Sequence, residues 1–311
     1  MTTSGASVWT LTGTQLIKAA LLKLRVIDPT QTIDSTTVND CTVALNAMLT
    51  AWQLDGVDIW LDQEIVVYMD ANAEYYDLGP SGDEAAELRD SVMTQLANDA
   101  AANETELTVD SITGFAANDN VGIILDDNTI YWDTANGAPA NTEITIETGL
   151  SGASSTDNYV FGYTSAITRP IIISEARVRN TANDDTPLKV ITDRNEFMRH
   201  TDKTSTGEVQ EVYYDPLYPN GRLYVWPICG NDSITDRIIL STKRRIYDTD
   251  DPANDTMDLP DDVLNAVIWN LADELQPNYG LNFQNITQRA VAYYSLIRRV
   301  YKQKGSIYLR P

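Results

Sequence analysis

The chain has 311 residues, of which 43% are hydrophobic, so it is long enough to bury a sizeable core, and a disordered polymer is excluded. No run of apolar residues is long enough for a membrane-spanning helix, and the two cysteines, Cys41 and Cys229, stand too far apart for a disulfide scaffold or a cysteine-based zinc site. The 45 acidic and 22 basic residues give a net charge of −23, which excludes a general DNA-binding protein.

Two helices are predicted near the N-terminus. The first follows a cap at Thr12 or Thr14 and repeats apolar side chains every three or four positions up to residue 24. The second follows a cap at Asp34 or Ser35, and its apolar residues form one stripe: Val38, Cys41, Leu45, Met48 and Trp52. We expect residues 1–61 to form an antiparallel helical hairpin.

Strand patterns fill the middle of the chain. Residues 62–81 and 166–257 predict a central antiparallel β domain, in which 169–179 alternates with one slip and 219–221 forms a hairpin turn. Residues 82–165 differ, because after a short helix at 85–96 the strands are brief and separated by Asn, Asp and Gly turns. We therefore expect 82–165 to be a small, autonomous inserted β subdomain.

Helices return at residues 258–303, and 304–311 form an extended tail. Pro277 ends the first of two predicted helices, and the second runs from about residue 282 to 303. The core face of this last helix is predicted to contain Ile286, Ala290, Tyr293, Ile297, Val300 and Tyr301. Neither terminal helix pair can bury its apolar stripe alone, so the sequence predicts an α+β fold with a four-helix bundle carrying the central β domain.

Motifs for catalysis or for cofactor binding are absent from the sequence. The only histidine, His200, lies in a polar stretch without a serine motif, and no glycine-rich phosphate loop occurs. The acidic run 248–262 has Pro252 where a calcium loop needs a ligand and has no glycine for the sharp turn. We therefore expect neither an enzyme nor a metal or cofactor site. A pair of glycosidase carboxylates stays open, since that mechanism needs only two acids.

The charge reverses at the C-terminal end. Residues 26–168 hold 25 acids and one base, whereas 275–311 hold six bases and no acid. The basic residues of the last helix lie opposite its core face, and residues 306–309 alternate like a short strand that can pair with another chain. The predicted partner-binding residues are Arg298, Arg299, Lys302, Lys304, Ile307, Tyr308, Leu309 and Arg310. A solvated helix end is the alternative for Arg298 and Lys302.

Several segments resemble one known family in that family's order. The helical segments are 16–24, 44–56 (ALNAMLTAWQLDG) and 264–280 (LNAVIWNLADELQPNYG), and the β segments begin at 169–171 and include 211–227 (EVYYDPLYPNGRLYVWP) and 244–248. They resemble the phage head-to-tail adaptors, also called packaged-DNA stabilisation proteins, tail accessory factors or gatekeepers. The resemblance covers most of the chain except 82–165, which is similar to a variable insertion.

This resemblance implies a structural role at the head–tail junction of a virion that is assembled in the host cytoplasm. Such adaptors form a ring, typically of twelve copies, between the portal protein and the tail nozzle protein, and DNA passes through the ring without specific binding. The basic C-terminal residues would then contact the portal. Acidic residues along the channel would repel phosphate.

Two other functions stay open at this point. The abundant acids and the β insertion also suit a carbohydrate-binding or peptidoglycan-hydrolysing tail component. Alternatively, residues 82–165 can serve as a docking module for a tail fibre protein.

Overall fold

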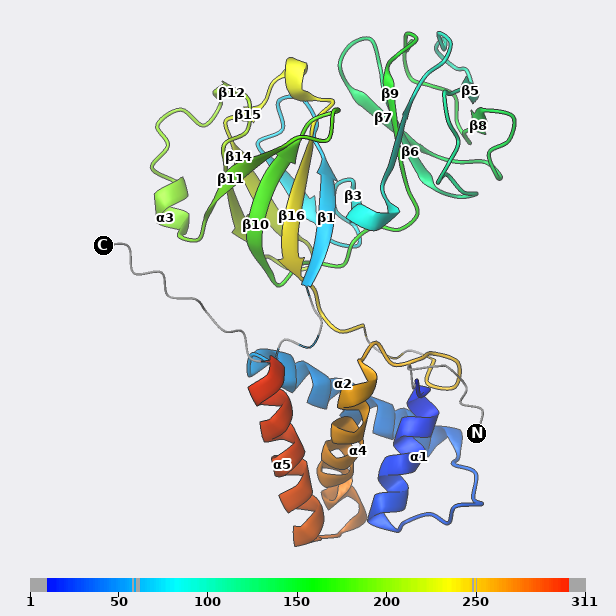
Figure 1. Cartoon of the computed structure of the whole chain (residues 1–311), viewed down its shortest axis with the longest axis vertical. Helices are drawn as coiled ribbons and strands as arrows, with labels where there is room; N and C mark the ends of the chain where they lie inside the picture. Colours follow the sequence, from blue (N-terminus) through cyan, green and yellow to red (C-terminus); the bar gives the residue numbers. More distant parts are fainter. Residues whose placement is uncertain (1–9, 58, 60–61, 248, 250, 302–311) are drawn as a thin grey trace, which may run out of the picture. The chain divides into compact units, whose positions relative to one another are not determined.

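The chain folds as two compact units (Figure 1). The computed structural model describes residues 10–57, 59, 62–247, 249 and 251–301. A helical unit comprises residues 1–61 and 246–311, and a β unit comprises residues 62–245. The sequence assigns a net charge of −5 to the helical unit and −18 to the β unit. Most of the acidic excess therefore belongs to the β unit.

Four α-helices build the described part of the helical unit: α1 (Gly13–Leu24), α2 (Ser35–Leu54), α4 (Asp261–Leu275) and α5 (Gln284–Tyr301). A short 3-10 turn (Pro277–Tyr279) follows α4. Helices α1, α4 and α5 lie side by side, and α2 crosses them at a steep angle (Figure 1). Of the helices that the structure describes, none has the length and apolar character needed to cross a lipid bilayer.

Side-chain caps fix where α1 and α2 begin. The Thr12 hydroxyl accepts a hydrogen bond from the Gln15 amide at 3.3 Å, and the Gln15 side chain accepts one from the Thr12 amide at 3.1 Å. This reciprocal capping box selects Thr12 over Thr14. Asp34 caps α2 by accepting a hydrogen bond from the Thr37 amide at 2.9 Å.

The core of the helical unit is centred on α4, which contacts α1, α2 and α5. The predicted stripe on α2, from Val38 to Trp52, is buried in this core. Ile246 and Met257 are buried there too, so residues 246–257 belong to the helical unit rather than to the β domain expected to reach residue 257. The helices at the two ends of the chain therefore share one core.

The predicted four-helix bundle is wrong, because α2 crosses the other helices and does not form an antiparallel hairpin with α1 (Figure 1). An apolar stripe specifies which side of a helix is buried, but it does not specify the crossing angle. By crossing, α2 covers several helices in turn, and near its C-terminal end Trp52 lies 5.3 Å from the Tyr294 ring of α5.

The predicted α+β class is wrong as well, since the described residues form sixteen strands and five α-helices and are mostly β structure. Eight strands make one nearly closed, barrel-like sheet in the order β2-β14-β13-β11-β10-β16-β1-β3. Their bounds are β1 (Asp62–Tyr68), β2 (Tyr75–Leu78), β3 (Ala85–Glu87), β10 (Ile172–Arg179), β11 (Asp185–Ile191), β13 (Glu211–Asp215), β14 (Gly221–Trp226) and β16 (Arg237–Lys243). The pair β11–β13 is parallel, so the sheet is not purely antiparallel as expected.

Side chains at alternate positions along the strands point inward and fill the barrel. On β1, Ile65 and Val67 point into the barrel core, and Leu223 and Val225 do so from β14. The predicted hairpin is confirmed, because β13 and β14 pair antiparallel across the 219–221 turn. The predicted slip in 169–179 is also confirmed as a change of register between Ile173 and Glu175.

Residues 91–164 form two small sheets beside the barrel. Their strands are β4 (Val92–Gln95), β5 (Glu106–Thr108), β6 (Asn120–Ile124), β7 (Ile130–Thr134), β8 (Glu143–Thr145) and β9 (Tyr159–Tyr163), in the orders β4-β9-β6-β7 and β5-β8. The helix expected at 85–96 is wrong, because Ala85–Glu87 is the barrel strand β3, followed by a 3-10 turn (Leu88–Asp90) and β4. The insertion therefore begins after β3 and not at residue 82.

The insertion shares an apolar cluster with the barrel and belongs to the same compact unit. It has its own apolar cluster, which includes Leu107 and Ile144. A second cluster joins Val66, Tyr68 and Ile239, on the outer side of the barrel, to residues of the insertion. In this cluster the Tyr68 ring lies 5.1 Å from Phe161 and 5.0 Å from Trp132.

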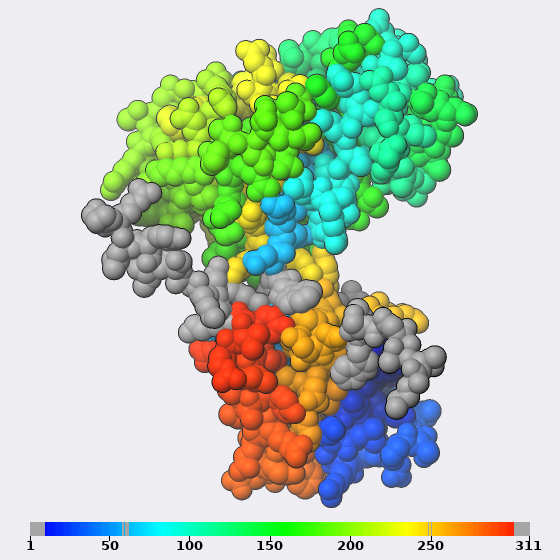
Figure 2. Space-filling view, in the orientation of Figure 1, coloured from blue at the N-terminus to red at the C-terminus, as the bar shows by residue number. Residues whose placement is uncertain are grey.

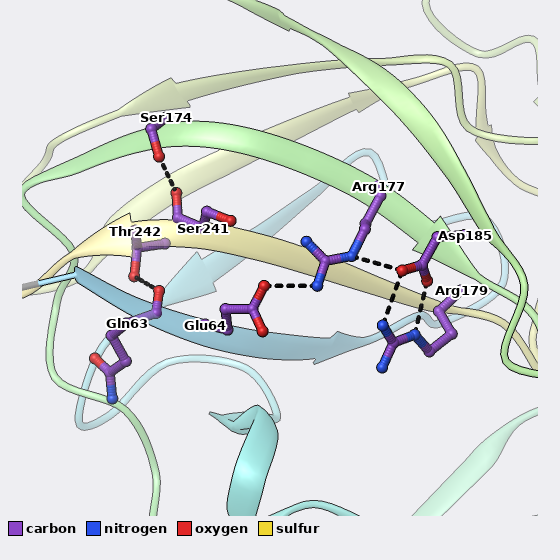
Figure 3. A network of polar contacts seen from close by, with 8 residues as sticks. All are labelled: Gln63, Glu64, Ser174, Arg177, Arg179, Asp185, Ser241 and Thr242. Atoms are coloured by element: carbon purple, nitrogen blue, oxygen red, sulfur yellow. Dashed lines mark hydrogen bonds and ion pairs between the residues drawn. The ribbon is translucent and has the colours of Figure 1, made fainter.

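A polar network ties three barrel strands together on their outer side (Figure 3). Arg177 on β10 lies 2.6 Å from Glu64 on β1 and 2.9 Å from Asp185 on β11. Arg179 donates two hydrogen bonds to the same Asp185 carboxylate, at 2.7 and 2.8 Å. These bonds lower the pKa of Asp185, which therefore stays ionised at neutral pH.

The remaining short elements of the β unit are α3 (Arg194–Phe197), β12 (Thr206–Gly207), β15 (Ile228–Cys229) and a 3-10 turn (Asn231–Ser233). Phe197 of α3 packs on the outer side of the barrel against Tyr213 and Tyr224, at 5.7 Å from each ring. The segment after α3 is held by Trp226, whose indole donates a hydrogen bond to the Asp202 carbonyl at 2.7 Å.

Candidate functional site

The basic residues singled out by the sequence begin on α5, at the surface of the helical unit. Arg298 and Arg299 are both exposed there; Arg299 lies opposite the buried Ile286, Ala290 and Ile297, and Arg298 lies at the flank of the helix. The other six predicted partner-binding residues lie outside the described residues: Lys302, Lys304, Ile307, Tyr308, Leu309 and Arg310. The structure thus places two of the eight together.

Arg298 also contacts α2, where it helps to fix the end of that helix. Its Nη1 lies 3.5 Å from Asp55 Oδ2, and the Tyr294 hydroxyl donates a hydrogen bond to the same oxygen. Burial and the neighbouring Asp55 carboxylate raise the pKa of Tyr294 to about 12, so its hydroxyl keeps its proton at neutral pH. The Arg298 side chain remains 48% exposed and can still face a partner.

A groove of about 440 Å³ follows α5 and extends the candidate surface beyond these two arginines. Its lining residues are Arg289, Ala292, Tyr293, Ser295, Leu296 and Arg299. At one end, Arg289 lies over the Trp269 ring at 4.8 Å, and Lys23 of α1 lies over the same ring at 4.9 Å. Within the described part of the chain, neither Arg289 nor Arg299 forms an ion pair.

Apolar side chains are exposed along the same helix. Val291 is 62% exposed, Leu296 44% and Val300 60%. Val300 was expected on the core face, and that expectation is wrong, because Ile297 and the half-buried Tyr301 occupy that side of the last turn. The Tyr301 hydroxyl donates a hydrogen bond to Asp262 of α4 at 2.7 Å. The outer side of α5 is thus partly apolar as well as basic.

Sequence reasoning missed Arg289 and Leu296. The signal was present in their spacing, since positions 289, 292, 296 and 299 recur every three or four residues on the side opposite Ile286 and Ala290. The prediction concentrated on the density of charge near the chain end, and Arg289 stands alone in the sequence.

His200 does not lie in a nucleophile–base arrangement. Its Nε2 is 2.9 Å from Glu211 Oε2, and its ring stacks on Trp226 with centroids 4.0 Å apart. These contacts hold the imidazole between a carboxylate and an indole, neither of which is a hydroxyl or thiol nucleophile.

The acidic run also makes contacts of its own. In its described part, Asp251 accepts hydrogen bonds from the Ala253 amide at 3.2 Å and from the Asn254 side chain at 2.7 Å, so it organises its own loop. Across the residues that the structure describes, no three His, Cys, Asp or Glu side chains gather as a possible metal site.

Comparison with known proteins adds no relative: no family model matches the chain, and no curated protein sequence matches it significantly.

Proposed function

We propose that this chain is a structural head-to-tail adaptor of a tailed phage, which forms a ring beneath the portal and has no catalytic activity. The observation that carries the proposal is the outer side of α5, which is basic and partly apolar on a chain of net charge −23. Such a surface suits an acidic protein partner, because complementary charge steers the encounter and apolar contacts hold the complex. The resemblance of the helical and β segments to the adaptor family adds support.

The two units have separate tasks in this proposal. The helical unit forms the wall of the ring, and the β unit reaches outward or towards the tail nozzle. The β unit carries a charge of −18, so wherever it borders the DNA path it repels phosphate and leaves the DNA free to move. Residues 91–164 are the part that is available to a tail fibre protein.

The portal contact is assigned to the C-terminal end of the chain. It starts at Arg298 and Arg299 and continues through Lys302, Lys304, Ile307, Tyr308, Leu309 and Arg310. Repulsion between copies of charge −23 keeps the free protein monomeric, and the portal supplies the template that brings the copies together. The assembled virion carries the protein at its head–tail junction.

Negative-stain imaging of the purified protein mixed with its portal tests the proposal. We expect an added ring of density on one end of the portal, and we expect high salt to weaken it. Portals that stay bare at saturating protein would contradict an adaptor. The same preparation added to a cell-wall suspension should leave the turbidity unchanged, and a fall in turbidity would favour a peptidoglycan-hydrolysing tail component.

A further inference from the structure

The outer side of α2 carries an apolar stripe that is open to solvent. Val43 is 71% exposed and Leu54 is 86% exposed. Ala47 and Ala51, which lie between them, are exposed as well. These residues recur at helical spacing on the side opposite the buried stripe of α2. A single exposed aliphatic residue is ordinary, but four in line over three turns form a surface that can bind another helix.

The charges of α2 and α5 are opposite. Within α2 the one charged residue is Asp40, which lies exposed beside the apolar stripe. Residues 275–301 contain three arginines and no acid. Two of these, Arg289 and Arg299, line the groove of α5 at either end of its apolar floor. An apolar helix face with one carboxylate beside it therefore has a basic and apolar counterpart in the same chain.

The two faces also match in length. From Val43 to Leu54 the stripe on α2 spans about 16 Å, at the helical rise of ~1.5 Å per residue. From Arg289 to Arg299 the groove of α5 spans about 15 Å on the same basis. Ala292 and Leu296 lie between the arginines, so apolar side chains would meet apolar side chains and the Asp40 carboxylate would reach a guanidinium group. Figure 2 shows the surface of α5, in orange to red, open along the helical unit.

Within one copy the two faces cannot meet. Helices α2 and α5 already bury their opposite sides in one core, and Trp52 and Asp55 at the end of α2 contact Tyr294 of α5. We propose that the outer side of α5 receives the outer side of α2 from a second copy of this chain. The pair then still offers one free α2 face, on the copy whose α5 is occupied, and one free α5 face, on the other copy.

A contact of this kind is head-to-tail, and it adds copies in succession until a ring closes. It deepens the proposed function and rests on it for ring closure, although the contact itself needs no portal. One helix pair makes a small interface, and copies of charge −23 repel each other, so the contact is weak until a template raises the local concentration. Arg299 lies where this face meets the segment assigned to the portal.

Cysteine trapping tests the contact without a portal, because cross-linking captures weak encounters. The native Cys41 and Cys229 are buried, so an added exposed cysteine supplies the reactive thiol. Full-length Val43→Cys and Leu296→Cys proteins, one carrying a size tag, are mixed and treated with a flexible bismaleimide. We expect mixed 43–296 dimers well above their statistical share. The matched control replaces Ile172, an aliphatic residue of the β unit that is 53% exposed, and Ile172→Cys mixed with Leu296→Cys should give only the statistical share.

Charge reversal adds a second readout. Arg289→Glu in the Leu296→Cys protein should lower the excess of mixed dimers at least threefold, while the circular dichroism spectrum stays unchanged. A statistical yield from the 43–296 mixture, or an excess of 43–43 or 296–296 dimers, would overturn the proposal. If mixed 43–296 dimers form in excess but portals mixed with the protein stay bare, the result would count against the adaptor function alone.

Discussion

Glu84 is a carboxylate that the folded β unit accommodates at a cost. It accepts a hydrogen bond from the Tyr163 hydroxyl, and its burial, with Asp83 nearby, raises its pKa above the ordinary value of 4.5. The Glu84 carboxylate therefore binds a proton more tightly in the folded state than in the unfolded state. The resulting stabilisation is complete below pH 4.5 and is lost as the pH rises through the folded pKa.

Glu84→Gln should consequently raise the free energy of unfolding at pH 7.5 and leave it nearly unchanged at pH 4. Glutamine removes the charge and can still accept the Tyr163 hydrogen bond. Urea denaturation of dilute protein, followed by tryptophan fluorescence at the two pH values, measures the difference. An equal effect at both pH values would show that the charge of Glu84 is not the cause.

Thr12 offers a second test at the level of one residue, since it closes the capping box of α1. Thr12→Ala should lower the free energy of unfolding by about 1 kcal/mol, because the Gln15 amide loses the Thr12 hydroxyl that accepts its hydrogen bond. Thr14→Ala is the matched control, as Thr14 lies inside the first turn of the same helix and should change stability by less than about 0.5 kcal/mol. Equal losses in the two variants would argue against the cap.

Among the elements, the insertion is the one whose removal should lower the stability of the rest of the β unit. Replacing residues 91–164 by a short Gly/Ser linker would uncover Val66, Tyr68 and Ile239 on the outer side of the barrel. We expect the remaining β unit to melt at a lower temperature and to bind the dye ANS, because the shared apolar cluster is lost. Melting followed by circular dichroism and by ANS fluorescence checks this.

A single substitution separates loss of the shared cluster from damage by the linker. Phe161→Ala should cost about 3 to 5 kcal/mol, because Phe161 is fully buried where the insertion meets the barrel. Leu107→Ala is the variant to compare with Phe161→Ala, because Leu107 lies in the insertion's own cluster rather than where the insertion meets the barrel. If deletion of 91–164 left the melting temperature unchanged, the two parts would be energetically independent despite their contact.

The sequence predicted where most helices and strands lie, but it predicted few of the pairs of elements that contact each other. Alternation located β13 and β14, and the turn residues between them determined that they pair. Nothing local could pair β11 in parallel with β13, since that contact joins strands separated by an intervening segment. The same limit applies to α2, whose stripe identified its buried residues but not its crossing direction.

At the scale of the molecule, the C-terminal segment should matter for assembly and not for folding. Removing residues 304–311 should abolish ring density on the portal and leave the melting temperature within about 1 °C, because a chain terminus adds little to a core. A Gly/Ser segment of the same length is the control for chain length alone. Normal assembly by either protein would remove the tail as the portal anchor.

Charge counting predicted part of the candidate site. The basic end of an acidic chain is visible without a structure, and Arg298 and Arg299 are exposed on α5 as expected. The groove between Arg289 and Arg299 was not predicted, because it depends on which side of α5 packs against α4. The exposed apolar stripe of α2 could not be recognised either, because its exposure depends on the direction in which α2 crosses its neighbours.

The chain enters and leaves the β unit through neighbouring strands. Asp62, the first residue of β1, is the register partner of Lys243, the last residue of β16. The two connections to the helical unit therefore start about 5 Å apart. A domain whose two ends lie so close together can be exchanged for another domain without separating the two chain segments that it joins. Residues 62–245 can thus be replaced or remodelled as one cassette, while the two chain ends keep their shared helical core.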